Sequence, residues 1–365
     1  MAVKTFSIKD TNDLNNLKNN MADFEPKLIV FFSSSDYDNL NPSQKFKEAY
    51  PNAKVIGCTS HSEYYKNDFS YNTISVMAID ENSVSDICVQ VVENVDNGYD
   101  MDEITSKLHS YYGTYNEILQ HFDKYVGLVL FESSCKVEEE FMDKLGTSTD
   151  IMFVGGTSST TSNGISKVYA DGKTYTNAVV LALLKTVSGY DVLKTQSAEI
   201  LSDKTYKVTK SDMKNRLLYE LDGRDVKEVY AEALGIDKSD IANYFVSNPV
   251  GVLANDEIFI RTMNEIQENG SVSLHCAIPE NTEIHILKLT DIVKDTEKAL
   301  NSAITYEPAG VINFNCLYRT FEMLNKKAEK EYCAIFGKYN SIGFSTSGEA
   351  FLGHINQTST ILVIK

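Results

Sequence analysis

The sequence has 365 residues, of which 42% are hydrophobic and 23% are charged, and its formal net charge is −17. This length favours two domains of about 150–200 residues each. So acidic a surface disfavours nucleic acid or an anionic membrane as the partner. The sequence has no apolar run of about 18 residues, so no membrane span is predicted.

The N-terminus and the cysteines indicate a cytoplasmic protein. The first ten residues, MAVKTFSIKD, lack the apolar segment of a secretory signal. The six cysteines lie far apart and form no CxxC pair. This pattern fits free thiols in a reducing compartment better than a disulfide framework or a structural zinc site. We therefore expect no cofactor and no metal.

The first predicted unit is a strand, a helix and two further strands. The apolar run KLIVFF (27–32) predicts a buried strand. Asn41 and Pro42 begin a helix, with Asn as the N-cap and Pro at the first helical position. A short strand at 54–56 ends at Gly57, and the strand 73–79 closes the unit.

The same order occurs twice more along the chain. The second unit has a strand at 126–131, a helix at 136–145 that ends at Gly146, a strand at 151–154 and a closing strand at 177–184. The third unit has strands at 310–314, before Gly343 and at 360–364, with a helix at 318–331. The similar spacing favours duplication of one unit, although ordinary β–α–β units have similar lengths.

A short polar helix is predicted at 12–20, and one long or two short helices at 100–122 with an interruption near Gly113. The remaining elements lie between the second and third units. Short strands are predicted at 190–196, 205–209 and 216–221, a helix at 222–234, a three-stranded meander at 257–263, 271–277 and 283–289, and a helix at 290–304. The polar stretch 189–211 is the best boundary. We expect an α/β protein whose repeated strand–helix–strand units form mixed sheets covered by helices, with domains at 1–200 and 201–365 that share an interface.

Each unit carries a glycine-rich loop. Residues 55–63 read VIGCTSHSE and residues 341–349 read SIGFSTSGE; the copy at 152–160, MFVGGTSST, lacks the glutamate. Parallel strands place their carboxyl ends at one edge of a sheet, where open α/β sheets bind ligands. Arg319 offers a planar fork for a carboxylate, and Glu349 can accept hydrogen bonds from an ammonium group. Together they suit an amino acid, or else they pair with each other.

The motifs resemble those of the FIST family, named for F-box and intracellular signal-transduction proteins. GFSTSGEA, INQTST and FNCLYR resemble its C-terminal signature, VIGCTS and FVGGTSS its N-terminal ones, and LDGRDVKEVYAEALG the stretch that joins them. The resemblance covers residue 25 to the end and implies a sensory module that binds a small ligand and signals to a separate protein. Ser62 stands where the family tends to have glycine, so the resemblance favours Glu349 over Glu63 as a ligand residue.

The expected ligand site combines residues of all three units. We expect contacts from Asn315, Cys316, Arg319, Gly343, Ser345, Thr346, Gly348 and Glu349, with Cys58, Thr59 and Glu63 from the first loop and Gly155 and Gly156 from the second. The Gly155–Gly156 pair alternatively cradles a phosphate, but it lacks the lysine of a P-loop, so a tight turn is favoured.

Two other classes of function remain open. Cys316 is a candidate nucleophile for acyl or thiol transfer, with His354 as its base, but free cysteines are commonly just buried. Cys58, His61 and Glu63 have the residue types of a metal site without a second cluster to complete it. His275 and Cys276 point to opposite faces of a predicted strand, so they cannot chelate together. The third class is an interaction module that works through its surface, without a small ligand.

Overall fold

The computed structural model describes residues 2–161, 164–254 and 257–365. Its three repeat units share one order of elements. The first unit contains β2 (Leu28–Ser34), α3 (Pro42–Ala49), β3 (Lys54–Ser60) and β6 (Ile74–Ile79). The second contains β8 (Tyr125–Phe131), α6 (Glu138–Ser148), β9 (Phe153–Thr157) and β12 (Ala178–Thr186). The third contains β23 (Gly310–Cys316), α9 (Leu317–Lys326), α10 (Glu329–Phe336), β24 (Ser341–Thr346) and β27 (Thr358–Ile364).

Within each unit the first two strands are parallel, and the closing strand pairs antiparallel with the first. The register is the same in the three units: Gly57, Gly155 and Gly343 lie opposite Phe31, Val129 and Asn313, respectively. Each closing strand also pairs with a strand that precedes its unit. These strands are β1 (Val3–Ile8), β7 (Val84–Glu93) and β13 (Tyr190–Gln196). The expected duplication therefore appears as equivalent topology.

A hairpin from each unit completes the sheet of another unit. The hairpins are β4 (Glu63–Tyr65) with β5 (Asp68–Ser70), β10 (Val168–Ala170) with β11 (Lys173–Tyr175), and β25 (Glu349–Phe351) with β26 (His354–Ile355). β4 pairs with β24, β10 with β3, and β25 with β9. The three six-stranded sheets therefore have the same strand order, and the exchange links the three units in a closed ring.

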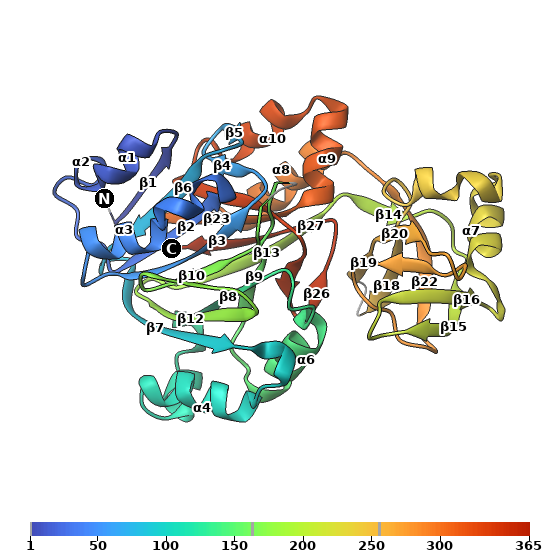
Figure 1. Ribbon diagram of the computed structural model, residues 1–365, viewed down its shortest axis with the longest axis horizontal. Helices are drawn as coiled ribbons and strands as arrows, with labels where there is room; N and C mark the ends of the chain where they lie inside the picture. The colour runs from blue at the N-terminus through green and yellow to red at the C-terminus, as the bar shows by residue number, and fades with distance from the viewer. Residues whose placement is uncertain (1, 162–163, 255–256) are drawn as a thin grey trace.

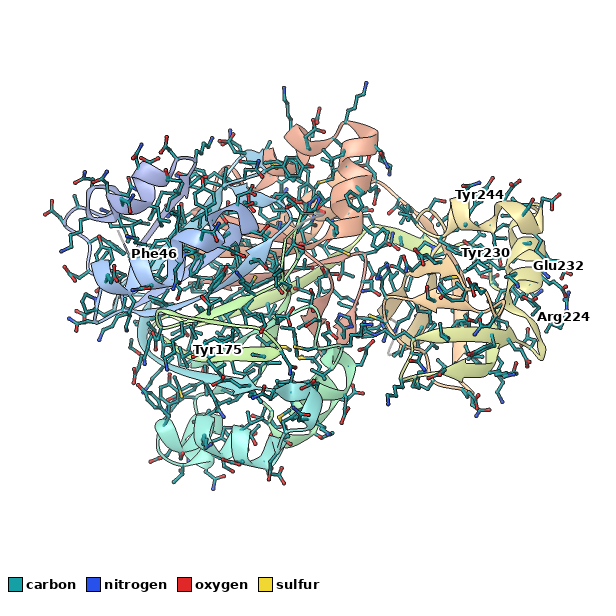
Figure 2. The ribbon with its side chains drawn as sticks, in the orientation of Figure 1. Phe46, Tyr175, Arg224, Tyr230, Glu232 and Tyr244 are labelled. Atoms are coloured by element: carbon teal, nitrogen blue, oxygen red, sulfur yellow. The ribbon has the colours of Figure 1, made fainter. Side chains whose placement is uncertain are left out.

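One hydrophobic core is shared by the three sheets. Phe32 of β2 stacks on Phe344 of β24 with 4.4 Å between ring centroids, and Phe314 of β23 meets both rings edge-on. Helices cover the outer faces, as Phe46 of α3 does against Phe31 (Figure 2). The fold is thus the expected mixed α/β arrangement, with the sheets inside and the helices outside (Figure 1).

Residues 198–289 form a separate unit, which we call the inserted unit. It lies between β13 and α8 (Ile292–Ala303) and projects from one side of the three-sheet core (Figure 1). The Thr290 N–H donates to the Ser197 carbonyl at 2.9 Å, so the chain enters and leaves this unit at neighbouring points.

The inserted unit has its own sheet and hydrophobic core. Tyr230 is buried there and donates to the Tyr244 carbonyl, whereas Arg224 and Glu232 pair at the exposed outer edge (Figure 2). Its elements are β14 (Ala198–Ile200), β15 (Tyr206–Asp212), β16 (Leu217–Leu221), β17 (Arg224–Asp225), α7 (Val226–Leu234), η4 (Lys238–Tyr244), β18 (Val250–Ala254), β19 (Glu257–Arg261), β20 (Met263–Ile266), β21 (Val272–Leu274) and β22 (Glu283–Leu289). In space, residues 290–365 belong with the first two units around one core.

Several element boundaries differ from the predictions. α6 continues through Gly146 to Ser148, because this glycine lies inside a regular helix and does not adopt a left-handed conformation there. The single helix expected at 318–331 is divided into α9 and α10 by Lys327, whose φ is +55°. Elsewhere, α4 (Met101–Tyr111) and α5 (Tyr115–Leu119) confirm the expected break near Gly113. Within the described residues, none of the helices has the length and hydrophobicity to span a membrane.

Candidate functional site

The three glycine loops meet at the carboxyl ends of β3, β9 and β24. Their backbones are joined directly to one another. The bonds run from the Ser345 N–H to the Ser62 carbonyl (3.0 Å), from the Ser159 N–H to the Thr59 carbonyl (3.1 Å) and from the Ser347 N–H to the Thr157 carbonyl (3.0 Å). The repeated motif thus assembles one polar cluster, as the strand-end argument predicts.

Close backbone approach explains the first glycine of each loop. A Cβ atom built on Gly57 would lie 2.4 Å from the Phe31 carbonyl oxygen, and one on Gly343 would lie 2.3 Å from that of Asn313. At Gly155 the corresponding distance, to the Val129 oxygen, is 1.8 Å. Only glycine allows the first two strands of each unit to pair at this point.

Glu63 and Glu349 are buried at equivalent places in two of the loops. The Ser60 hydroxyl donates to one oxygen of Glu63 at 2.5 Å, and the Thr73 N–H and hydroxyl donate to the other at 3.2 and 2.8 Å. Burial raises the pKa of Glu63 to about 8 and that of Glu349 to about 7, against the lowering effect of the hydrogen bonds. Each carboxyl group fastens its loop to the closing strand of its own unit.

The second unit has a buried glutamate at a different place, Glu132, which the sequence analysis missed. Glu132 follows β8 and accepts from the backbone N–H groups of Ser134 and Asn177, both at 2.9 Å. It therefore ties the turn after β8 to the start of β12, in the unit whose glycine loop lacks a glutamate. The sequence did offer a signal for Glu132. It is a carboxylate directly after the first strand of the one unit whose glycine loop has no glutamate.

Arg319 is buried on α9, with 1% of its surface exposed. Its guanidinium donates to Asn315 Oδ1 (3.0 Å), to the Ser197 hydroxyl (3.2 Å) and to the Thr296 hydroxyl (2.8 Å). Its hydrogen-bond partners in the described part of the chain include no carboxylate. Arg319 and Glu349 are therefore bonded to different neighbours, and the pairing offered as one alternative does not form.

The candidate nucleophile Cys316 is in an environment that disfavours its thiolate. Burial, and then the nearby Glu349, raise the pKa of Cys316 well above its usual range. His354, the expected base, instead places its Nδ1 atom 3.0 Å from the sulfur of Cys276. Burial likewise raises the pKa of Cys58. Neither thiol has the activation that nucleophilic catalysis requires.

The other predicted ligand residues are mostly enclosed in the cluster. Asn315 Nδ2 donates to the Tyr64 hydroxyl at 3.0 Å, and the Ser345 hydroxyl lies 2.6 Å from that of Ser62. Gly156 packs against Thr346 and Gly348. Ser347 is exposed and His61 is half-buried beside the rings of Tyr71 and Phe321. A ligand approaching the loops would meet these residues first.

A cavity of about 520 Å³ lies between the core and the inserted unit. It is lined by charges of both signs from β13, α8 and the inserted unit: Lys194, Glu199, Glu257, Asp295 and Lys298. Lys194, whose side chain is 8% exposed, crosses to Glu257 at 2.7 Å and to the Ile258 carbonyl at 3.2 Å. Arg319 does not line the cavity. It donates to the hydroxyl groups of Ser197 and Thr296, which are sequence neighbours of lining residues. We call this cavity the inter-unit cleft.

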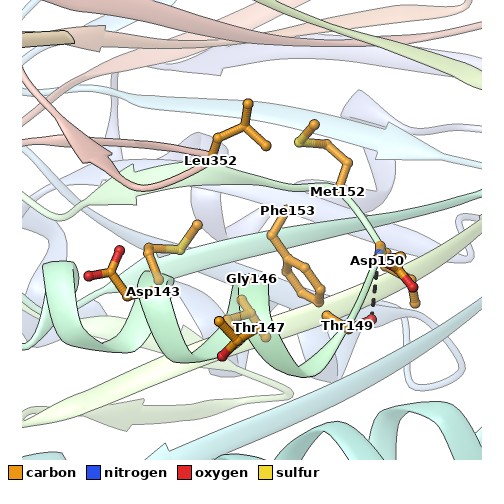
Figure 3. A pocket seen from close by; sticks show the side chains of 11 residues that line it. Asp143, Gly146, Thr147, Thr149, Asp150, Met152, Phe153 and Leu352 are labelled. Carbon is orange, nitrogen blue, oxygen red and sulfur yellow. Dashed lines mark hydrogen bonds between the residues drawn. The ribbon is translucent and has the colours of Figure 1, made fainter. Parts of the chain in front are cut away.

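A second cavity, of about 470 Å³, lies beside α6 (Figure 3). Met142, Phe153 and Leu352 give it apolar walls, and Leu352 is 66% exposed. The Thr149 hydroxyl accepts from the Ile151 N–H at 3.2 Å and holds the adjoining turn. Its lining offers fewer charged groups than the inter-unit cleft does.

Comparison with known proteins gives two family matches and one relative. The model of the FIST N domain matches residues 27–224, and the model of the FIST C domain matches residues 227–351. An uncharacterized protein of Methanocaldococcus jannaschii is 25% identical over 360 residues, which cover 88% of this chain and 69% of that protein. These matches extend across nearly the whole of the sequence.

Proposed function

Because this chain belongs to the FIST family, whose domains are associated with sensory signal transduction, we propose that it is a sensory protein that binds a small polar metabolite in the inter-unit cleft. One observation carries the proposal. The cleft brings positive and negative side chains from the core and the inserted unit around one cavity of about 520 Å³. Cavities of this size, with a few fixed polar groups, suit small ligands.

The charges of the cleft favour an amino acid or a similar zwitterion. Lys194 and Lys298 supply cations for a carboxylate, and Glu199, Glu257 and Asp295 supply anions for an ammonium group. Lys194 is held in place by its burial and by its bond to the Ile258 carbonyl. A ligand carboxylate that replaces Glu257 at Lys194 would form a charge-assisted bond with little loss of side-chain freedom.

The position of the cleft suggests how binding becomes a signal. Polar contacts hold the inserted unit on the core, such as Thr262 to Gln357 and His275 to Tyr318. Interfaces of this kind permit relative motion. A ligand that contacts both sides would favour one arrangement of the inserted unit, which a separate partner protein then recognises. We place this activity in the cytoplasm, because the chain is acidic and its thiols are free.

A binding screen with matched variants tests the proposal. Thermal-shift measurements with free amino acids and other small metabolites should find a stabilising ligand, and calorimetry should then give its Kd. Lys298→Ala and Glu199→Gln should each weaken binding about tenfold or more, since each removes one charged contact of the ligand. Lys294→Ala, on the same helix but outside the cleft, should leave the Kd unchanged.

The outcomes separate the cleft from the other readings. Loss of binding in Ser347→Ala or His61→Ala, with normal binding in the cleft variants, would place the ligand on the glycine loops as the sequence analysis expects. A screen without any stabilising metabolite would count against a small-ligand sensor and favour a surface interaction module.

A further inference from the structure

Three side chains with metal-binding atoms meet where the inserted unit contacts the core. Glu139 comes from α6, His354 from β26, and Cys276 from the turn after β21. One ligand atom of each lies within 4.8 Å of the other two. Cys276 is 0% and His354 4% exposed, and the Glu139 side chain is 20% exposed. The cluster is therefore closed on the protein side and open at Glu139.

The sulfur and the carboxylate oxygen of this cluster both lie close to one ring nitrogen. The Cys276 sulfur lies 3.0 Å, and Glu139 Oε1 3.6 Å, from the same atom, Nδ1 of His354. Nδ1 carries at most one proton, so it can donate to only one of them. The other ring nitrogen, Nε2, is buried without a hydrogen-bond partner. A cation between the three atoms would contact the sulfur, the nitrogen and the oxygen at once.

The surroundings hold the three groups in place. Arg216 donates to Glu139 Oε2 at 2.5 Å, which leaves Oε1 directed at the cluster, and the Ala277 N–H reaches Oε1 at 3.0 Å. The imidazole packs on Gly348, where a Cβ atom would lie 2.0 Å from Nε2. Such outer contacts orient the ligands of metal sites. His275 faces the other way and bonds to Tyr318 at 2.6 Å.

We propose that Glu139, Cys276 and His354 form a binding site for one Zn²⁺ ion, which joins the inserted unit to the core. A thiolate, an imidazole and a carboxylate are the ligand types that zinc takes, whereas Mg²⁺ and Ca²⁺ prefer oxygen alone. Tetrahedral zinc separates sulfur and nitrogen ligands by about 3.5 Å, so the 3.0 Å between the Cys276 sulfur and Nδ1 of His354 needs to lengthen by only about 0.5 Å. The fourth position is left for water on the exposed side of Glu139. On binding, the proton between the sulfur and Nδ1 leaves to solvent.

The zinc proposal does not rest on the ligand proposed for the inter-unit cleft. Two of its ligands belong to the core and one to the inserted unit, so an occupied site would restrict their relative motion. The sequence alone indicates none of this, because positions 139, 276 and 354 meet only through the tertiary structure.

Cobalt titration of the full chain tests the proposal. After treatment with a chelator, one equivalent of Co²⁺ should produce thiolate charge-transfer and tetrahedral ligand-field absorption, and Zn²⁺ should displace it. Cys276→Ser should remove the charge-transfer band and weaken Zn²⁺ binding at least tenfold. Cys333→Ser, a substitution at another buried cysteine, should leave both unchanged.

Two further measurements keep the result clear. Glu139→Gln retains a carbonyl oxygen for the Ala277 N–H, so this variant should fold. It lacks the carboxylate charge, so its affinity for Zn²⁺ should be at least tenfold lower than that of the wild type. X-ray absorption of the zinc-loaded wild type should show one sulfur among its nitrogen and oxygen ligands. Absence of stoichiometric Co²⁺ binding by the wild type, or an unchanged spectrum in folded Cys276→Ser, would overturn the proposal.

Discussion

Glu63 and Glu349 make the same set of hydrogen bonds in two different units. Each accepts from a hydroxyl three residues earlier, that of Ser60 or Thr346, and from both the N–H and the hydroxyl of a threonine at the start of its closing strand. The motif first seen as a repeat in the sequence is thus a repeated fastening of loop to strand. Its carboxyl groups are buried, and this has a consequence for stability.

Stability should fall as the pH rises from about 4.5 towards 8. The pKa of Glu63 rises from 4.5 when unfolded to about 8 in the fold, so the folded state holds more protons in this window. The stabilisation is complete below pH 4.5 and is lost as the pH passes through about 8. Each such group changes the free energy of unfolding by at most about 1.4 kcal/mol per pH unit. Urea unfolding across pH 5–9 should show that the free energy of unfolding depends less on pH in Glu63→Gln than in the wild type. Glu25 is exposed, so the control Glu25→Gln should keep the pH dependence of the wild type.

The first glycine of each loop should resist substitution. Gly155→Ala should cost about 3 kcal/mol or more, since its Cβ would meet the Val129 oxygen at 1.8 Å. Gly146→Ala is the matched control. It lies inside α6 with nothing within 4 Å of its Cβ, so alanine should raise stability by about 0.5–1 kcal/mol. Equal effects in chemical denaturation would contradict the role assigned to Gly155.

The inserted unit should be separable from the three-sheet core. Replacing residues 198–289 with a short glycine–serine loop joins Ser197 to Thr290, whose backbones are already hydrogen-bonded. Because the two parts have distinct hydrophobic cores, the shortened chain should retain cooperative thermal unfolding. A chain that loses its near-ultraviolet circular dichroism or aggregates would show instead that the core depends on the inserted unit.

The thiols should react slowly in the folded protein. All six cysteines are buried, and the pKa of Cys316 is raised by burial and by Glu349. Ellman's reagent at pH 7.5 should therefore modify less than one thiol per chain within minutes, and all six after denaturation. Rapid modification of Cys316, identified by mass spectrometry, would revive the alternative of an enzyme with this nucleophile.

Local patterns in the sequence determined the repeat units and much of their secondary structure. The apolar run before Ser33 and the N-cap of Asn41 with Pro42 predict β2 and α3, because burial and capping act within a few residues. The glycine motifs likewise predict where the loops converge, but the expected strand ends at the glycines are wrong: β3, β9 and β24 continue two or three residues beyond Gly57, Gly155 and Gly343, because each glycine pairs inside the ladder. The family resemblance rests on the same motifs and is confirmed.

Only the tertiary structure decided which strands complete each sheet and which side chains meet between the units. The exchanged hairpins have strands of two or three residues, too short to show a period, and their partners lie in other units. Arg319 was expected beside a ligand, but its neighbours Ser197 and Thr296 depend on where the chain leaves the core and where it rejoins it. The contact between Cys276 and His354 spans 78 positions and depends on how the inserted unit docks. Such long-range contacts are set by packing, which no local pattern of residues records.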